Sequence, residues 1–358
     1  MPETVPTYFQ YILAILCSSA ISVYAVRKII FIARTRKLYD IPDNIRKIHG
    51  AQIPSLGGIG IFIGYLTTAA FFIERAWFAV VAASVILFFT GIYDDIMNMR
   101  PSKKLVAQLA ASAVAIMLAD VRITSLHGIL GIYELSYPVS VGLTVFCCTF
   151  FINVFNFMDG IDGLACTLAI LYTGVLGMLF AFMGSRYLAG ISFSIMGATA
   201  GLFWFNRPPA RIYMGDTGSM LLGFTIFILT VCCMYMGSTP VVSATPLHIH
   251  TDLGMTMLLL AMLLLPVYDA VRVFILRTLR GISPLRADRL HLHYYLLDAG
   301  LSHRGAVGVL AGTNVAVMLC AWALQAVHPL LLLLCMLLII TLVVWVVWAL
   351  RQKKMRAA

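Results

Sequence analysis

The stretch VGLTVFCCTFFINVFNFMDGIDGLA, residues 141–165, begins as an apolar run and then carries asparagine or aspartate at positions 153, 156, 159 and 162. A second apolar run, LAILYTGVLGMLF at 168–180, follows almost directly. Such runs are typical of membrane-spanning helices, in which polar side chains are costly unless they face a cavity or a partner. The stretch therefore predicts that one membrane helix ends near residue 156, that a polar turn follows, and that the next helix starts soon after.

The composition of the whole chain indicates a membrane protein. Of its 358 residues, 61% are hydrophobic and 11% are charged, whereas soluble domains average about 45–50% apolar and about 25% charged residues. Backbone polar groups in lipid must be hydrogen-bonded within the protein, and this sequence lacks the alternating pattern of a membrane β-barrel. We therefore expect an all-α polytopic membrane protein that forms a single domain over residues 1–358.

Apolar runs separated by polar or glycine-rich segments predict about eleven transmembrane helices. An odd number of spans puts the two termini on opposite sides of the membrane, and basic residues concentrate on the cytoplasmic side. Of the 25 Lys and Arg residues, only Arg75, Arg122 and Arg186 fall on the other side. The N-terminus is therefore expected outside and the C-terminus in the cytoplasm. The predicted spans lie near 8–32, 56–73, 76–93, 105–121, 138–156, 164–183, 187–205, 219–236, 253–276, 305–324 and 329–350.

The concentrated polar segments all fall in connections on that basic side. Their position at the ends of membrane helices favours a site for an anionic substrate at the cytoplasmic edge of the membrane. The net charge of +10 is mostly a signal of this topology and gives no reason to expect nucleic-acid binding. The five segments are about 34–55, 94–104, 153–163, 206–219 and 277–304.

Within the opening stretch, Asn153 and Asn156 lie on neighbouring turns of one helix face. The two glycines after them allow the chain to turn and to bring Asp159 and Asp162 back towards that face. The alternative is that these aspartates and glycines form only a polar turn.

Asp94 and Asp95 follow the third span, and adjacent side chains on a helix diverge by about 100°. We expect one of them to face the site, while the other caps a helix or pairs with Lys103 or Lys104. A surface cap is the alternative.

In GDTGS, residues 215–219, Asp216 is either an N-cap or a ligand beside a helix start whose free N–H groups attract phosphate. Mg²⁺ takes oxygen ligands and often joins one or two carboxylates to substrate phosphates. The segment therefore suits a magnesium site.

The basic segment DRLHLHYY, residues 288–295, carries His291 and His293 two residues apart, which is not the spacing of a helical zinc pair. Arg289 and His293 are four apart and share a face if the segment is helical. Such a donor-rich loop suits a sugar or a diphosphate, and a solvated interfacial loop is the alternative.

Two features inside the spans have structural alternatives. Asp269, in the ninth span, is either a substrate contact or half of an ion pair with Arg272 or Arg277. Gly60 and Gly64 form a GxxxG pattern, for which close helix packing is favoured over phosphate binding.

Taken in order, these motifs resemble those of the polyprenyl-phosphate N-acetylhexosamine-1-phosphate transferase family over nearly the whole chain. The last motif is similar to that of the branch that transfers GlcNAc-1-phosphate to undecaprenyl phosphate. That branch usually has a third histidine where this chain has Tyr294, so no catalytic role is carried over to this position. The matching segments are R-K-x-H-x-x-x-I-P-x-x-G-G at 46–58, D-D at 94–95, N-x-x-N-x-x-D-G-x-D-G at 153–163, G-D-T-G-S at 215–219 and S-P-x-x-x-D-R-x-H-x-H at 283–293.

The resemblance implies an enzyme with about eleven membrane helices and a Mg²⁺ site, with Mn²⁺ as a substitute, on the cytoplasmic face of the bacterial inner membrane. Its reaction would convert UDP-GlcNAc and undecaprenyl phosphate into undecaprenyl-diphosphate-GlcNAc and UMP, the first membrane step of a cell-surface glycan. The implied partners are a UDP-sugar, undecaprenyl phosphate and the lipid bilayer, with no nucleic acid. A homodimer is a candidate assembly.

The resemblance also implies individual roles. Asp216 would bind the metal with Asn156 beside it, Asp162 would lie at the uridine, and Lys104 near the phosphates. Asp94 matches a base or nucleophile, although a phosphate monoester with a second pKa of about 6 scarcely needs deprotonation before it attacks. Positioning and charge neutralisation should therefore dominate. The predicted set comprises the catalytic residues Asp94, Asp95, Lys104, Asp159, His291 and His293, the substrate-binding residues Lys47, His49, Asn153, Asn156, Asp162, Asp269 and Arg289, and the metal ligands Asp216 and Asn156.

Other classes of function remain as alternatives. A secondary transporter, with Asp269 and the Asn/Asp stretch as an ion path, would show internal repeats and discontinuous helices, and the sequence shows neither. A non-enzymatic scaffold leaves the one-sided polar clusters unexplained. The same chemistry with another UDP-2-acetamido sugar is the nearest alternative.

Overall fold

The computed structural model describes residues 7–37, 53–128, 131–237, 249, 252–283 and 288–357. Its regular elements are α-helices, one 3₁₀ turn, η1 (Arg75–Trp77), and an isolated antiparallel bridge between Ser125 and Glu134. Ten helices in this described part are long and apolar enough to cross a membrane. They are α1 (Thr7–Arg36), α3 (Phe78–Met97), α4 (Pro101–Ala119), α5 (Tyr137–Phe157), α6 (Leu164–Phe182), α7 (Arg186–Asn206), α8 (Gly215–Gly237), α9 (Asp252–Leu279), α11 (His303–Ala323) and α12 (Pro329–Ala357).

These helices confirm the all-α polytopic class and all but one of the predicted spans. The exception is the span predicted at 56–73, where α2 (Gly57–Ala69) has 13 residues. A helix of that length covers about 20 Å, against about 30 Å for the hydrocarbon core of a bilayer. A second difference is α10 (Leu292–Asp298), a short helix inside the predicted connection 277–304.

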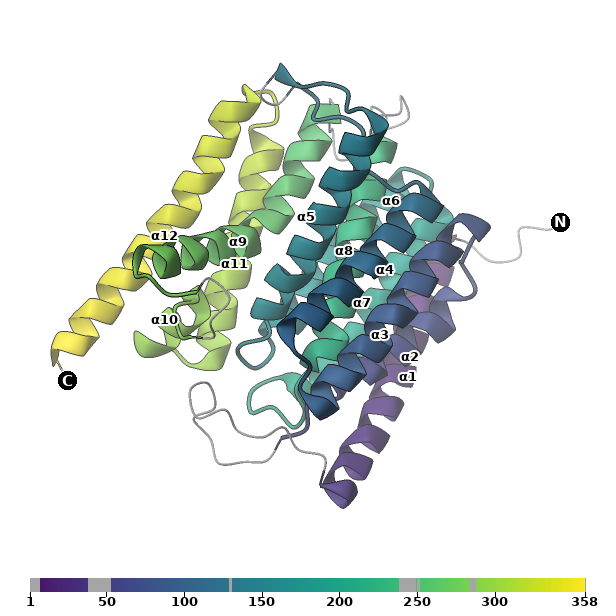
Figure 1. Ribbon diagram of the computed structural model, residues 1–358, viewed down its shortest axis with the longest axis horizontal. Helices are drawn as coiled ribbons and strands as arrows, with labels where there is room; N and C mark the ends of the chain where they lie inside the picture. Colours follow the sequence, from purple (N-terminus) through teal and green to yellow (C-terminus); the bar gives the residue numbers. More distant parts are fainter. Residues whose placement is uncertain are drawn as a thin grey trace.

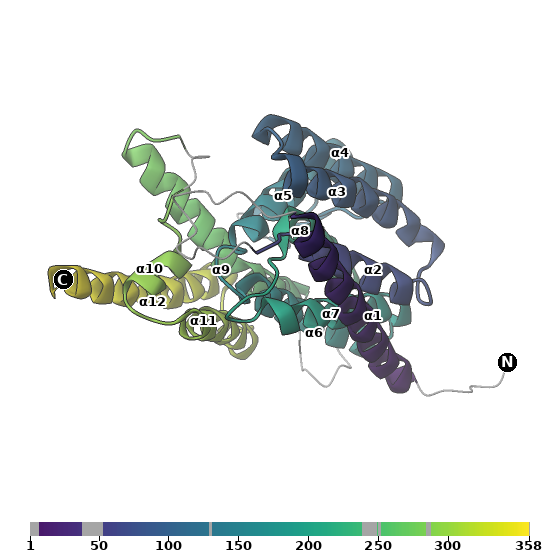
Figure 2. The same ribbon diagram turned by 90° about the horizontal axis from the view of Figure 1, so that it is seen from below.

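The core of the bundle is α8, in whose most apolar stretch 78% of the residues are buried. It packs against α2, α3, α5, α6 and α9. In Figures 1 and 2, α1, α2 and α7 lie on one side of α8, and α9, α11 and α12 lie on the other. Because α8 begins at Gly215, its central position places the GDTGS segment in the middle of one end of the bundle.

Glycines allow α2 and α3 to approach their neighbours closely. A Cβ added at Gly64 would lie 2.7 Å from the carbonyl oxygen of Ser18 in α1, and one at Gly91 would lie 2.6 Å from the backbone nitrogen of Thr217 in α8. A side chain at either position would therefore collide with backbone atoms. The preference for close helix packing over phosphate binding is confirmed for Gly60 and Gly64, since a Cβ at Gly60 would likewise collide with Val26 of α1, as small-xxx-small patterns predict.

The polar turn between α5 and α6 covers residues 158–163, as predicted. Of its two glycines, only Gly163 has a left-handed backbone, with φ of +81°. Gly160 instead makes room for a distant side chain, because a Cβ there would lie 2.7 Å from Cε1 of His293. The expectation that both glycines serve the turn is therefore wrong for Gly160.

Gly64→Ala is expected to lower the thermal unfolding temperature, because overpacking against the α1 backbone costs about 1–3 kcal/mol. Gly312→Ala in α11 is the matched control, since nothing lies within 4 Å of an added Cβ there and alanine favours a helix by about 1 kcal/mol. The measurement is thermal unfolding of both purified variants in detergent. Equal melting temperatures would contradict the close packing of α1 and α2.

Candidate active site

The ends of α3, α4, α5 and α8 meet at one end of the bundle, beside the α5–α6 turn. Hydrogen bonds and ion pairs join most of the predicted catalytic and metal-binding residues there. We call this group the aspartate cluster. It comprises Asp94, Asp95, Lys104, Asn156, Asp159 and Asp216.

Lys104, in the first turn of α4, lies between two carboxylates. Its Nζ is 3.0 Å from Oδ2 of Asp94 and 2.7 Å from Oδ1 of Asp216. The side chains of Lys104 and Asp94 are only 15% and 10% exposed. Charges so far removed from water are stable only when they are paired, so this ammonium group ties the ends of α3, α4 and α8 together.

Asp95 binds the start of α8. Its Oδ1 accepts the N–H of Asp216 at 2.7 Å, and its Oδ2 accepts the N–H and the hydroxyl of Thr217 at 3.0 Å and 2.5 Å. Asp159 accepts the N–H of Gly215 at 3.2 Å. Carboxylates are favourable at a helix N-terminus, where N–H groups lack helical partners. The expectation that these N–H groups attract a phosphate is therefore wrong, because two protein carboxylates already bind them.

The two adjacent aspartates thus have different partners, as their divergence on a helix predicts. While Asp95 reaches across to α8, Asp94 also accepts the N–H of Met99 at 2.6 Å. That contact holds the connection between α3 and α4, which begins at Asn98 with a left-handed φ of +51°. Asp94 therefore orients both this connection and Lys104.

Asn156 joins the cluster from the last turn of α5. Its Nδ2 donates to Oδ1 of Asp216 and, at 2.7 Å, to Oγ of Ser219. Because the amide nitrogen is committed to these contacts, the side-chain oxygen of Asn156 is the atom that would bind a cation.

The oxygen atoms of Asp94, Asp216 and Asn156 fit a magnesium ion. Among the described residues, no group of three or more His, Cys, Asp or Glu side chains could hold a metal by itself. Mg²⁺ does not require one, because it keeps several waters and uses one or two carboxylates together with substrate phosphates. Asp94 and Asp216 already converge on one cationic group, Lys104, so this position stabilises positive charge.

The environment of Asp159 raises its pKa well above the ordinary value, mainly because the carboxyl group is desolvated. The hydrogen bond from the Gly215 N–H opposes this effect, and the nearby carboxylates of Asp216 and Asp95 add to it. Compared with an exposed aspartate, Asp159 therefore retains a proton to a higher pH, which limits the repulsion among these carboxylates.

Asn153 lies about one helical turn before Asn156 and binds a residue that the sequence patterns missed. Its Nδ2 donates to Oε1 of Gln108 in α4 at 2.6 Å, and Gln108 is completely buried. A signal did exist, since Gln108 follows Lys104 by four residues on one face of an apolar helix. The pair joins α4 to α5 about one helical turn further into the bundle than the aspartate cluster.

Asp162 and the previously unpredicted Asn206 hold the connection between α7 and α8. Asp162 accepts the N–H of Ala210 at 3.1 Å. Asn206 accepts the N–H of Gly163 and donates to the carbonyl oxygen of Ile212, both at 3.0 Å. In the sequence, Asn206 precedes an Arg-Pro-Pro segment, which indicates the end of a helix but not this tertiary contact.

A second cluster surrounds Asp269, which is 2% exposed and lies in the C-terminal half of α9. Its Oδ1 is 2.7 Å from Nη2 of Arg272, and its Oδ2 is 2.9 Å from Nδ1 of His291. The N–H of Leu292 donates to Oδ1 at 3.1 Å. Of the two arginines considered as its partner, Arg272 is the one in contact, so the structural ion pair is present.

The histidine segment differs from its prediction. Because α10 begins at Leu292, with His291 as its N-cap, Arg289 and His293 share no helical face. Arg289 instead pairs with Asp298 at 3.1 Å. The imidazole rings of His291 and His293 are stacked, with their centroids 5.6 Å apart.

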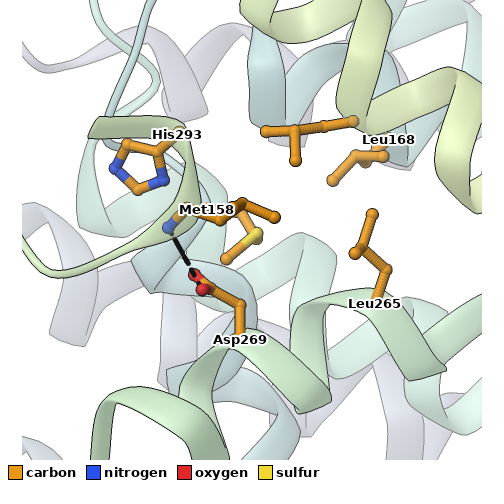
Figure 3. A pocket seen from close by; sticks show the side chains of 7 residues that line it. Met158, Leu168, Leu265, Asp269 and His293 are labelled. Carbon is orange, nitrogen blue, oxygen red and sulfur yellow. Dashed lines mark hydrogen bonds between the residues drawn. The ribbon is translucent and has the colours of Figure 1, made fainter. Parts of the chain in front are cut away.

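Contacts of the two histidines with the α5–α6 turn and with the last residue of α5 link the second cluster to the turn that carries Asp159. The His293 ring lies against Gly160, and the centroids of the His291 and Phe157 rings are 5.3 Å apart. Figure 3 shows His293 and Asp269 at the edge of one small cavity. The last motif of the sequence therefore reaches the turn that carries the opening stretch. Lys47 and His49 lie outside the described residues.

Comparisons with known proteins agree with this geometry. A family model described as Glycosyl transferase family 4 matches residues 77–234, which include the whole aspartate cluster. The chain is 30% identical over 279 residues to the "Probable undecaprenyl-phosphate N-acetylglucosaminyl 1-phosphate transferase" of Bacillus subtilis (strain 168), covering 76% of this chain and 73% of the relative. It is 29% identical over 283 residues to the "Undecaprenyl-phosphate alpha-N-acetylglucosaminyl 1-phosphate transferase" of Escherichia coli (strain K12), covering 77% and 73%.

A third relative has a different lipid in its name. The chain is 29% identical over 292 residues to the "Decaprenyl-phosphate N-acetylglucosaminephosphotransferase" of Mycolicibacterium smegmatis, covering 73% of this chain and 69% of the relative. The bundle, the site and these similarities define a multi-pass membrane sugar-1-phosphate transferase. The chain belongs to glycosyl transferase family 4, the polyprenyl-phosphate N-acetylhexosamine-1-phosphate transferases.

Asp95→Ala is expected to destabilise the protein more than Asp94→Ala, although the two residues are neighbours. Loss of Asp95 leaves two N–H groups of α8 without their acceptor, at about 1–3 kcal/mol for each buried group. Loss of Asp94 removes the acceptor of one N–H group, that of Met99, and leaves Lys104 paired with Asp216 at 2.7 Å. Thermal unfolding in detergent measures the difference, and an equal or larger effect of Asp94→Ala would refute the assigned contacts.

Proposed function

We propose that the enzyme transfers GlcNAc-1-phosphate from UDP-GlcNAc to undecaprenyl phosphate, as the first membrane step of a cell-surface glycan. The names of the relatives support the sugar, and two of the three name undecaprenyl phosphate. The observation that carries the chemistry is the convergence of Asp94, Asp216 and Lys104 at one end of the membrane bundle. Such a site suits a reaction between two phosphate groups that repel each other.

Asp216, Asn156 and Asp94 are proposed to hold Mg²⁺, with Mn²⁺ as a substitute. The bound ion would neutralise phosphate charge and reduce the repulsion between acceptor and donor. The role of the protein is to hold the ligand oxygens in fixed positions. Asp95 holds the helix start that carries Asp216, and Asn156 orients its carboxylate.

The proposed reaction is a single displacement. A phosphate oxygen of the lipid attacks the β-phosphorus of UDP-GlcNAc, and the bond from that phosphorus to the oxygen of UMP breaks. The lipid phosphate is mostly dianionic at neutral pH, so Asp94 has no proton to remove and instead positions Lys104. The ammonium group of Lys104, beside both carboxylates, is placed to stabilise charge on the phosphates.

The second cluster is proposed to bind the sugar or the diphosphate through His291 and His293. Because both oxygens of Asp269 have protein partners, we assign this residue to positioning His291 rather than to contacting substrate. Arg289 is assigned to holding α10 through Asp298. These two assignments revise the substrate-binding roles expected from the sequence.

The other substrate contacts are carried over from the family resemblance. Asp162 is proposed to lie at the uridine, where it also fixes the N–H of Ala210. Lys47 and His49 are proposed to contact the substrate from the first connection. Asn153 is proposed to support this region through Gln108. The charge asymmetry of the connections supports a site on the cytoplasmic face of a bacterial inner membrane. A homodimer is the proposed candidate assembly.

Asp216→Asn is expected to reduce transfer by at least about 100-fold, because the variant loses the charge of a proposed metal ligand. Asp120→Asn is the matched control, since Asp120 forms an exposed pair with Arg122 outside the site. The assay is UMP release from UDP-GlcNAc with undecaprenyl phosphate and Mg²⁺, with thermal unfolding to show that both variants fold. Near-normal turnover of a folded Asp216→Asn variant would exclude the metal role.

The proposed substrate is tested with a panel of UDP-sugars in sealed vesicles of both orientations. UDP-GlcNAc is expected to give the highest rate of lipid product, removal of divalent ions is expected to abolish it, and Mn²⁺ to restore it. Inside-out vesicles should use added donor, whereas right-side-out vesicles should not. A faster reaction with another UDP-2-acetamido sugar would favour the alternative donor, and entry of labelled nucleotide sugar without lipid product would favour a transporter.

A further inference from the structure

A proline interrupts the hydrogen bonding of α9 just before the second cluster. Pro266 lies inside this membrane helix, three residues before Asp269. Proline has no N–H group, so the carbonyl oxygen of Met262, four residues earlier, lacks its usual helical donor. In a membrane, a carbonyl group freed in this way needs a donor from elsewhere in the protein.

Asn314 of α11 supplies that donor. Its Nδ2 lies 3.0 Å from the carbonyl oxygen of Met262, and both residues are completely buried. An amide in the middle of an apolar helix is costly unless it is hydrogen-bonded. The contact therefore joins α11 to α9 at the position where proline removes the bond of the helix itself.

This contact lies next to the groups that hold the histidine segment. Leu265, beside Pro266, and Leu310, about one turn before Asn314, both line the cavity at which His293 and Asp269 lie. Figure 3 shows Leu265 and Asp269 on α9 facing this cavity. A change in the path of α9 at Pro266 would therefore move Asp269, and with it His291.

We infer that Asn314 is a positioning residue for the transfer reaction, which acts by fixing the interrupted helix α9 and thereby Asp269 and His291. The inference rests on the proposed function in one respect, namely the role of His291 at the substrate. Among the described residues, Asn314 forms no hydrogen bond with a member of either cluster, and its effect passes through Met262 and Pro266. A side chain that only filled space at this position would have no such effect.

Asn314→Leu removes the donor and keeps the number and branching of the side-chain heavy atoms. Thr313→Val is the matched control, because the Thr313 hydroxyl donates within α11, to the Val309 carbonyl oxygen at 2.8 Å. The leucine variant is expected to lose about 10- to 100-fold in kcat, the effect of a small displacement of reacting groups, whereas the control keeps its rate. In ¹⁵N-histidine NMR, the His291 signal, assigned by its loss in His291→Gln, should move only in Asn314→Leu.

The double variant Pro266→Ala/Asn314→Leu separates positioning from simple hydrogen-bond satisfaction. The alanine that replaces Pro266 has an N–H group that can donate to the Met262 carbonyl oxygen, so the thermal stability should return towards that of the native protein. The His291 signal and the rate should stay altered, because the interruption of α9 is gone. This variant carries the test if Asn314→Leu does not fold.

Three results would overturn the inference. One is a folded Asn314→Leu protein with native kcat and a native His291 signal. The second is recovery of both quantities in the double variant, and the third is failure of the double variant to fold. If the native enzyme releases no UMP from UDP-GlcNAc, the proposed substrate fails, but the His291 signal still decides whether Asn314 positions this segment.

Discussion

The ion pairs of Lys104 with Asp94 and Asp216 are the interaction on which the rest of the site depends. Exposed ion pairs contribute about 0–1 kcal/mol, whereas a buried charge that is left without any partner costs about 3–5 kcal/mol. With 15% and 10% exposure for Lys104 and Asp94, this group is nearer the buried limit. Three helices must therefore end at the same place for these charges to be tolerated. The packing of the membrane bundle and the geometry of the site are two results of one constraint.

The position of the central helix α8 determines where in the bundle these charges meet. Because α8 is almost surrounded by other helices, its N-terminal turn can lie only at the middle of one end of the bundle. Its N–H groups would be costly there without acceptors, and Asp95 and Asp159 provide them. Glycines in α2 and α3 allow the close approach that these bonds require. The side chain of Asp216 is then held by its contacts with Asn156 and Lys104 before any substrate binds.

Much of the fold could be predicted because the apolar runs and the polar segments are strong local signals. The polar stretch at 153–163 ends one helix and starts another, as predicted, and the DD and GDTGS segments meet. What the patterns did not show is which distant group each side chain binds. Asp95 binds an N-terminus in another helix, and Gly160 accommodates His293. Such contacts depend on tertiary packing, which no periodicity encodes, and the same is true of the contact between Asn314 and Met262.

The most direct measurement is X-ray diffraction from crystals grown with Mn²⁺ and UDP, in which anomalous scattering locates the metal. A single site joining α3, α5 and α8 requires one anomalous peak at the Asp216 carboxylate, within reach of Asp94 and the Asn156 oxygen, with the UDP phosphates on its open side. A metal bound instead at His291 and His293, or a diphosphate on the opposite end of the bundle, would contradict the assignment of the aspartate cluster as the active site.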